Sequence, residues 1–272
     1  MNLRRLFPIL LLLLLASACT KNATVPADGV AHPISTNDDP DQRYTYAGLP
    51  ESVDYPHPLS LLAYQGFITA YDEIRGNPAW VAYRVFAVPE YISTARPSRF
   101  LTDENTENRI SHDDYTHSGY DRGHMAPNFA IVTRFGSEAQ RETFLMTNII
   151  PQRPALNRNW WATAERRIAR DYSEMYDQVW VIIGPVYQET GGWIGETVKI
   201  PSHNFMIIMV EEEGKLKMMA FLVDQEISGG DPHAMYLVSV NQIEEKTGLN
   251  FNPFLEQAFA DSIESLISPD LW

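Results

Sequence analysis

The sequence has one cysteine in 272 residues, and its basic residues are outnumbered, with 21 Lys and Arg against 35 Asp and Glu. A single cysteine excludes an intramolecular disulfide and a metal site built from several thiolates. The formal net charge of −14 is a poor match for a protein that binds nucleic acid over its whole surface, because phosphate binding depends on cationic contacts. No apolar run reaches the ~20 residues that a membrane-spanning helix needs.

Several motifs of common enzyme classes are also missing. The sequence contains no Gly-x-Ser-x-Gly nucleophile elbow. The glycines within 191–195 lack the spacing and the strand-to-helix context of a dinucleotide-binding turn. His112 and His117 lack the spacing of a helical zinc site, so we interpret the segment 112–117 as a polar loop that approaches a functional site.

The first residues have the pattern of an export signal. Arg4 and Arg5 precede the apolar stretch 6–15, and the small residues 16–18 provide a cleavage site, which predicts a signal peptide over 1–18. Cys19 follows directly, and this arrangement resembles a bacterial lipoprotein lipobox. The resemblance implies lipidation at Cys19 and a membrane anchor in the bacterial envelope, on the outer membrane or facing the periplasm. An ordinary signal peptide followed by an incidental cysteine is the alternative.

The next segment, 19–45, is rich in Thr, Asn, Asp, Pro and Ala and poor in large apolar residues, which predicts a flexible tether. The remainder, 46–272, is long enough for one domain with a full core. Cleavage of the signal would remove Arg4 and Arg5 and leave a net charge of −16. The charge is uneven, because 120–170 contains eight Arg, no Lys and four acidic residues. A local basic zone on an acidic body is compatible with one site for an anionic substrate.

Apolar and β-branched runs separated by turn residues predict an antiparallel sheet. The predicted strands cover 80–88, 179–186, 205–210 and 216–223, with a hairpin turn at 211–214 and a further strand pair around Gly66. A capping-box pattern at Ser137 and Gln140 predicts a helix to about residue 146, and further helices are expected over 157–176, 236–246 and 254–267. Together these elements predict an α+β fold with a central antiparallel β-sheet flanked by helices.

The segment Asp121-Arg122-Gly123-His124 carries the first candidate chemistry. Histidine titrates near neutrality, so His124 can accept a proton from water. Arg122 can hold a phosphate with two parallel hydrogen bonds. Asp121 can orient or neutralise a neighbouring group. The alternative is a salt-bridged turn with a structural histidine.

A second segment places an amide and a carboxylate at helical spacing. Asn157, Trp161 and Glu165 are four residues apart, which on an α-helix puts them along one ridge with about 80° of drift from first to last. An amide oxygen is a hard, neutral ligand that suits Mg²⁺, an ion that keeps most of its waters and accepts few protein ligands. A surface helix anchored in the core by its tryptophans is the alternative.

Taken together, these motifs resemble the DNA/RNA non-specific endonucleases, the ββα-metal nucleases that include endonuclease G. The resemblance covers about residues 60 to 255. Its motifs, in chain order, are Arg75-Gly76-Asn77-Pro78-Ala79-Trp80, Asp121-Arg122-Gly123-His124, Thr147-Asn148-Ile149-Ile150-Pro151-Gln152, Leu156-Asn157-x-x-Trp160, Glu165, Gly184-Pro185-Val186-Tyr187 and Lys199-Ile200-Pro201-Ser202-His203.

The resemblance implies a mechanism. His124 would be the general base, and Asn157 would be the sole direct protein ligand of a hydrated Mg²⁺, for which Mn²⁺ is a possible substitute. Glu165 would orient metal-bound water. The substrates would be DNA and RNA, cut with little sequence specificity to leave 5′-phosphate ends.

The resemblance also assigns supporting roles and leaves gaps. Arg75 and Arg122 would stabilise negative charge on the phosphate, and Asn148 would hold His124 or the loop around it. Family members often carry an arginine one turn after the glutamate, where this sequence has Ala169. Two other functions stay open: a non-catalytic nucleic-acid-binding lipoprotein on a nuclease fold, and a phosphodiesterase that acts on another diester.

Overall fold

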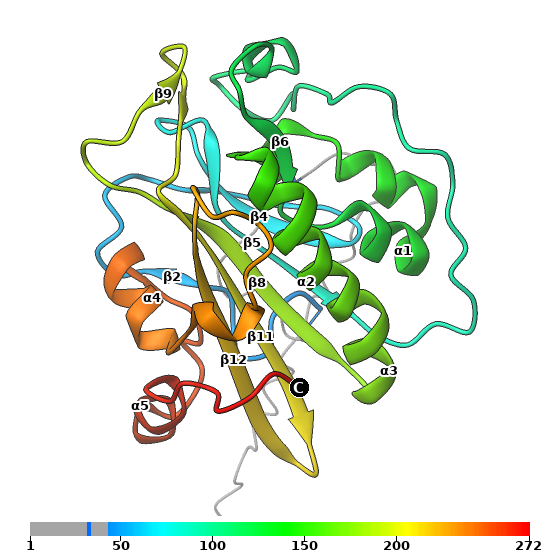
Figure 1. The fold of residues 1–272 in the computed structure, drawn as a ribbon, viewed down its shortest axis with the longest axis vertical. Helices are drawn as coiled ribbons and strands as arrows, with labels where there is room; N and C mark the ends of the chain where they lie inside the picture. The colour runs from blue at the N-terminus through cyan, green and yellow to red at the C-terminus, as the bar shows by residue number, and fades with distance from the viewer. Residues whose placement is uncertain (1–31, 34–42) are drawn as a thin grey trace, which may run out of the picture.

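A computed structural model describes residues 43–272 and the backbone of residues 32–33 (Figure 1). The predicted signal peptide, Cys19 and most of the predicted tether lie outside the described residues. None of the helices in the described part is long and apolar enough to cross a bilayer.

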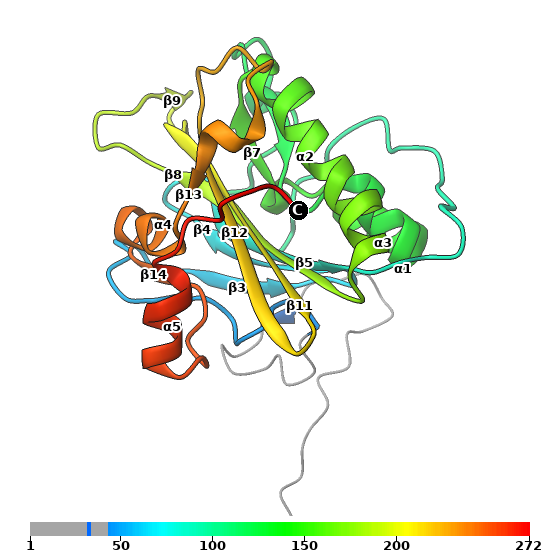
Figure 2. The same cartoon turned by 60° about the horizontal axis from the view of Figure 1, so that its bottom comes forward.

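An eight-stranded sheet forms the centre of the molecule (Figures 1 and 2). The strand order across the sheet is β1-β3-β4-β5-β8-β11-β12-β13, and every neighbouring pair is antiparallel, which confirms the predicted fold class. The strands are β1 (His32–Pro33), β3 (Ser60–Ala63), β4 (Phe67–Asp72), β5 (Asn77–Val85), β8 (Val179–Val186), β11 (His203–Glu212), β12 (Lys215–Asp224) and β13 (Leu237–Val238).

The strongest strand predictions are confirmed. β8 has the predicted bounds, and β11 and β12 form the predicted hairpin. Glu213 and Gly214 both have positive φ, 52° and 72°, which is the backbone that a two-residue hairpin turn requires. The prediction for β5 is shifted by three residues, because the strand covers Asn77–Val85 instead of 80–88. Its last residue, Val85, pairs with Val179, where β8 begins, so residues beyond Val85 have no partner strand.

Successive side chains of β8 point to opposite faces of the sheet, and the core therefore has two layers. Val181 and Ile183 face a core with the helices α1, α2 and α3, whereas Trp180 and Ile182 face a core with α4 on the other side. Figure 2 shows the sheet between these two groups of helices. The helices are α1 (Asn128–Glu142), α2 (Ala162–Arg166), α3 (Ser173–Met175), α4 (Val240–Thr247) and α5 (Gln257–Glu264).

The predicted helix over 157–176 exists as one continuous helical run that contains two π-helical segments, Leu156–Trp161 and Arg167–Tyr172. π-helical turns are rare and often mark functional sites. Trp160 and Trp161 are buried in the core, as expected of the anchor of this helix.

The other helix predictions need correction. α1 begins at Asn128, nine residues before the predicted start, and Gly136 interrupts it with φ 87° and ψ −172°. The capping-box prediction is wrong, because the Gln140 side chain is buried and bonds to Thr94 and to Asn128 instead of Ser137.

The C-terminal helices are shorter than predicted. α4 begins at Val240 behind a capping box formed by Ser239 and Gln242, and it ends as predicted at Gly248, which is left-handed. α5 covers only eight of the fourteen predicted residues.

Three small sheets and three short 3₁₀ helices complete the fold. β6 (Asp121–His124) pairs with β7 (Ile149–Gln152) immediately before the long helical run, which gives a β-β-α arrangement. The remaining elements are β2 (Glu51–Ser52) with β14 (Leu249–Asn250), β9 (Trp193–Ile194) with β10 (Val198–Lys199), and the 3₁₀ helices Asp113–Tyr115, Met146–Asn148 and His233–Tyr236.

Candidate active site

The Asp121–His124 motif forms strand β6, whose backbone lies tightly against β7. Asp121 pairs with Gln152 and His124 pairs with Ile149. A Cβ at Gly123 would lie 2.1 Å from Oε1 of Gln152, so a side chain at this position is excluded unless Gln152 moves. The glycine of the motif therefore permits the close strand pairing that positions its neighbours.

The chain just after His124 is fixed by the buried side chain of Asn148. The Ala126 amide donates to Asn148 Oδ1 at 2.8 Å, and Asn148 Nδ2 donates to the carbonyl oxygens of Ala126 and Thr143, each at 2.9 Å. The Met125 amide donates to the Asn148 carbonyl oxygen at 2.9 Å. Asn148 therefore holds the backbone that carries His124, in the place that the sequence predicted for it.

A pocket of about 610 Å³ lies over β6 and the start of the long helical run. Four of the predicted site residues, together with Asp121, line it. The lining residues are Ser93, Thr94, Arg96, Phe100, Asp121, Arg122, His124, Asn128, Phe129, Val132, Asn157, Arg158, Ala162 and Glu165.

His124 presents a neutral imidazole to this pocket. Its ring packs between Phe100 and Phe144, with ring centroids 5.2 and 5.0 Å away. Burial, and then the nearby charge of Arg96, lowers the pKa of His124 to about 3. The ring is therefore unprotonated at neutral pH and able to accept a proton. Nε2 is buried and has no hydrogen-bond partner among the described residues, so Nδ1 is the nitrogen left to accept a proton.

Asn157 is oriented by Asp121. Its Nδ2 donates to Asp121 Oδ2 at 2.9 Å, so its carbonyl oxygen is left for other partners. Arg158 holds the same carboxylate through Nε at 2.8 Å and Nη2 at 2.6 Å. Burial alone would raise the pKa of Asp121, but the hydrogen bonds from Arg158 and Asn157 lower it. Asp121 is thus an ionised anchor for the Asn157 amide.

Glu165 lines the same pocket eight residues, about two turns, further along the helical run. Burial raises the pKa of Glu165 to about 8, and the charge of Arg96 partly opposes this shift. The predicted ridge is only partly correct, because Trp161 turns into the core while Asn157 and Glu165 reach the pocket. The π-helical segment around Asn157 changes the angular spacing on which the α-helical prediction relied.

Arg122 forms one wall of the pocket and is held by the polar loop predicted to approach it. Its guanidinium donates to the carbonyl oxygen of His112 through Nε at 3.0 Å and to Thr116 Oγ1 at 3.2 Å, and it lies over the Tyr115 ring. These contacts fix the orientation of the guanidinium and of its remaining N–H donors. Arg122 is therefore pre-positioned to bind an anion.

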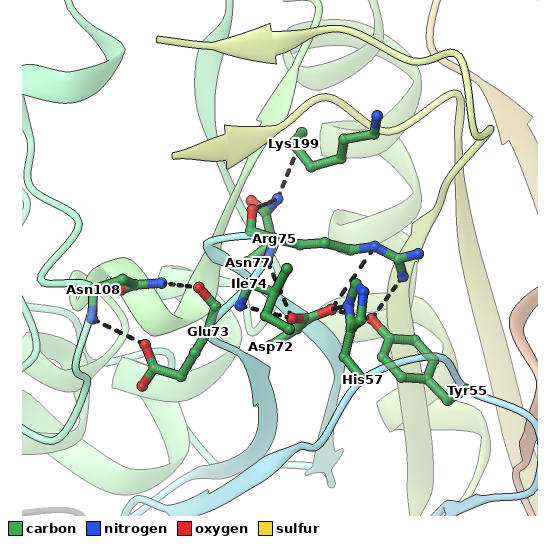
Figure 3. A network of polar contacts seen from close by, with 9 residues as sticks. All are labelled: Tyr55, His57, Asp72, Glu73, Ile74, Arg75, Asn77, Asn108 and Lys199. Atoms are coloured by element: carbon green, nitrogen blue, oxygen red, sulfur yellow. Dashed lines mark hydrogen bonds and ion pairs between the residues drawn. The ribbon is translucent and has the colours of Figure 1, made fainter. Parts of the chain in front are cut away.

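The structure does not bring Arg75 into this pocket. Figure 3 shows Arg75 in a separate polar network at the turn between β4 and β5, where it donates to the Tyr55 hydroxyl at 2.9 Å and pairs with Asp72 at 3.8 Å. Its guanidinium also stacks on the ring of Tyr187, 4.4 Å from the centroid. Asp72 further accepts hydrogen bonds from the Tyr55 hydroxyl and from backbone amides. These contacts give Arg75 a structural role in this chain.

Sequence reasoning missed Arg96, which takes a place in the pocket that it had assigned to Arg75. Arg96 lies in the loop after β5, lines the pocket, and shifts the pKa of both His124 and Glu165 through its charge. No periodicity marks this loop; its only signal is a pair of arginines, Arg96 and Arg99, in a segment without a predicted strand or helix.

The predicted basic zone is largely structural. Of its eight arginines, only Arg122 and Arg158 line the pocket. Ala169, where a family arginine was expected, is buried, and its carbonyl oxygen accepts a hydrogen bond from Arg134 at 2.7 Å. The nearby Arg170 stacks on Tyr91.

No group of three or more His, Cys, Asp or Glu side chains in the described part of the chain is arranged to chelate a metal ion. The pocket has two carboxylates, those of Asp121 and Glu165, and its other side-chain oxygens are neutral: the amides of Asn157 and Asn128 and the hydroxyls of Ser93 and Thr94. Such a set fits a hydrated hard cation that keeps most of its waters. A cation here would also favour the ionised form of Glu165, whose pKa burial has raised.

Comparisons with known proteins agree with this geometry. A sequence model of the DNA/RNA non-specific endonuclease family matches residues 51–258. The mitochondrial nuclease EXOG of Xenopus laevis is 32% identical over 226 residues, which cover 75% of this chain and 62% of the relative. Human mitochondrial endonuclease G is 28% identical over 216 residues, which cover 73% of this chain and 71% of the relative. The chain spans about three fifths of the length of the EXOG relatives that it matches.

A solved structure supports the same fold. A chain in the crystal structure of an EndoG/EndoGI complex superimposes with a TM-score of 0.64 at 27% sequence identity. The match covers 72% of this chain and 87% of that chain.

Proposed function

The chain belongs to the DNA/RNA non-specific endonuclease family, and from this premise we propose that it is a metal-dependent endonuclease that hydrolyses phosphodiester bonds of DNA and RNA. One observation carries the proposal: a neutral imidazole, His124, and the amide of Asn157 line one open pocket together with Glu165 and three arginines. These groups come from separate elements of the chain, and their convergence supplies a base, a metal ligand and anion-binding cations at one place.

His124 is the general base of the proposed reaction. The attacking water forms a bond to phosphorus and passes its proton to the ring, the bond between phosphorus and the 3′-oxygen breaks, and the leaving 3′-oxygen takes a proton from solvent water. Because Nε2 has no exposed surface, we assign the proton to Nδ1. The depressed pKa keeps the ring unprotonated over the whole neutral range. The products carry 5′-phosphate and 3′-hydroxyl ends.

Asn157, oriented by Asp121, is the proposed direct protein ligand of a hydrated Mg²⁺, and Mn²⁺ suits the same oxygen donor. The bound ion would supply neutralisation of negative charge on the phosphate and on the leaving oxygen. Glu165, which lines the same pocket, would orient water bound to that ion. Arg122 and Arg96 attract the phosphate and stabilise its developing charge.

Low sequence specificity follows from the kind of contacts that this pocket offers. Its cations and metal-binding groups address the phosphate, which is the same at every nucleotide, and such contacts carry no direct base information. The acidic body limits adhesion of nucleic acid elsewhere, since the net charge of the chain is −14.

Incubation of the purified protein with supercoiled plasmid, with RNA and with a small phosphodiester tests the proposal. We expect plasmid and RNA to be cut in Mg²⁺, cutting to stop with excess chelator, and activity to return when Mg²⁺ or Mn²⁺ is restored. A gel shift of plasmid without cleavage would support a non-catalytic binder instead. Cleavage confined to the small diester would support a different phosphodiesterase.

We further propose that the protein is exported and anchored in the bacterial envelope through a lipid on Cys19, with residues 19–45 as the tether. The support is the order of charged, apolar and small residues before Cys19. Since one acyl chain binds a membrane only weakly and stable anchoring takes more than one, a multiply acylated cysteine would suffice.

A Cys19→Ser variant, expressed at the same level as the wild type, tests the anchor. The wild type is expected in the membrane fraction and the variant in the soluble extract, with nuclease activity per molecule unchanged. A variant that stays in the membrane fraction after salt washing would instead indicate an uncleaved signal, and a soluble wild type would refute lipidation.

A further inference from the structure

Trp193 is the one tryptophan of the described chain with a large exposed surface, 41% of the side chain. It lies on β9, in a hairpin with β10 that projects from the molecule at the end where β6 and β7 lie (Figures 1 and 2). An indole that is 41% exposed on a projecting hairpin contributes less to the core than the buried tryptophans do, so its position calls for a different explanation.

The hairpin is anchored to the wall of the active-site pocket. Ile194 and Val198 are buried in a hydrophobic cluster with Tyr115 and Ile149, and Phe100 packs against the same cluster. Phe100 also lines the pocket and packs against the His124 ring at an interplanar angle of 49°. The cluster therefore connects the base of the hairpin to the residues that carry the proposed chemistry.

The network of Figure 3 fixes the hairpin from its other side. The Lys199 amide donates to the Arg75 carbonyl oxygen at 2.9 Å, and Asn77 Nδ2 donates to the Lys199 carbonyl oxygen at 2.8 Å. The motif that contains Arg75 thus holds β10 in place. The indole on β9 is presented by a rigid support and not by a loose loop.

A cation lies behind the indole. Lys199 Nζ is 4.9 Å from the centroid of the Trp193 ring and donates to the carbonyl oxygen of Gly191. The ammonium is itself largely buried. One face of the indole is therefore backed by a positive charge, and the exposed surface of the side chain is available to a ligand.

A second aromatic–cation pair lies against the same hydrophobic cluster as the hairpin. Arg153 stacks over Tyr120 at 4.4 Å from the ring centroid, and Tyr120 packs against the same cluster as Ile194. Tyr120 directly precedes Asp121 of the pocket. Aromatic rings interleaved with cations are the arrangement by which proteins bind single-stranded nucleic acid.

We propose that Trp193, backed by Lys199, is a stacking platform for a nucleobase of a strand whose scissile phosphate lies in the pocket, with the Tyr120–Arg153 pair as a further contact for that strand. The inference rests on the proposed nuclease function and narrows its substrate. Bases in a duplex have both faces covered, so the platform takes an unpaired base. The enzyme therefore gains affinity for single-stranded or locally melted DNA and RNA that extend beyond the cleaved bond.

Kinetics on single-stranded oligonucleotides of increasing length test this platform with the full-length protein. For the wild type, KM falls as the strand becomes long enough to reach Trp193. In Trp193→Ala this gain disappears, and KM for the long oligonucleotide rises about 5- to 150-fold, because base–aromatic stacking is worth ~1–3 kcal/mol. The kcat changes little, since the base contacts no reacting atom. Trp193→Phe restores most of the affinity.

Phe259→Ala is the matched control, because Phe259 on α5 is 43% exposed and has no contact with the hairpin cluster. It should leave KM unchanged at every length. Equal KM values for the wild type and Trp193→Ala on the long strand, with cleavage intact, would overturn the platform and leave the nuclease function standing. Absence of cleavage by the wild type would overturn the proposed function, and anisotropy titration of labelled oligonucleotide would then still compare Trp193→Ala with the wild type.

Discussion

His124→Ala should lower kcat/KM for DNA cleavage by about 10²–10⁴-fold, the contribution of a positioned general base. The reason lies in the site itself: the ring is neutral, one nitrogen is enclosed, and no other imidazole lines the pocket. Single-turnover cleavage rates at saturating Mg²⁺ measure the effect directly. Mg²⁺ affinity should change far less than the rate, because the ring is not a metal ligand in the proposed arrangement.

The free energy of unfolding as a function of pH is the control for the His124→Ala variant. The folded-state pKa of His124, about 3, lies below the ~6.5 of an unfolded chain. Protonation therefore favours unfolding, and the histidine costs the wild type stability as pH falls below about 6.5. The free energy of unfolding of His124→Ala should accordingly fall less steeply between pH 6 and pH 4 than that of the wild type.

His117→Asn is a matched histidine change outside the pocket lining, and asparagine tolerates the positive φ of 62° at that position. It should cleave like the wild type. Near-normal cleavage by a folded His124→Ala would remove the general-base assignment, whatever the outcome for His117→Asn.

Local patterns predicted the elements whose environment is repetitive. β8 and the β11–β12 hairpin follow from uninterrupted apolar runs and a short polar turn, because a strand buried on both faces needs nothing else. The stop of α4 at Gly248 is similarly local, since only the left-handed backbone there is required. Local patterns did not predict the end of a strand where the end is set by a partner strand far away in the sequence. Residues after Val85 are the example, because they have no partner in β8 and so do not belong to β5.

The residues of the candidate site fall into the same two groups: those that lie in local motifs and those that distant parts of the chain place there. His124, Asn148 and Asn157 lie in short motifs whose contacts are made within or between two adjacent segments, so the sequence identified them. Arg96 reaches the pocket from a loop without regular structure, and nothing local distinguishes it from Arg75. The choice between these arginines depends on the path of the chain after β5, which no short pattern encodes.

The π-helical turn also determines which side chains of the helical run face the pocket. Spacing of four residues placed Asn157, Trp161 and Glu165 on one ridge, but the π-helical segment Leu156–Trp161 separates the indole from the two polar groups. As a result the indole fills the core beneath the pocket, and the amide and the carboxylate keep the solvent side. The amide is oriented by its hydrogen bond to Asp121.

Asn157→Ala should reduce cleavage by about 100-fold or more at physiological Mg²⁺ and displace the Mg²⁺ titration to higher concentration, because charge neutralisation by a bound metal is worth several kcal/mol. The substitution removes the one amide oxygen that Asp121 directs away from itself, and it frees the Asp121 carboxylate from one of its two partners. Calorimetric titration with Mg²⁺ or Mn²⁺ gives a readout that does not depend on turnover. Weaker metal binding and slower cleavage should appear together, and excess metal should recover part of the rate.

Two variants separate the ligand role from simple damage to the helix. Asn159→Ala removes an exposed amide two residues away, outside the pocket lining, and should leave both the rate and the metal titration unchanged. Arg158→Ala removes the ion pair to Asp121 but keeps the Asn157 amide, so it should weaken metal binding less than Asn157→Ala does. If Asn157→Ala lowers the rate while its metal affinity equals that of the wild type, the amide positions substrate or Asp121, and the metal must be held by the carboxylates alone.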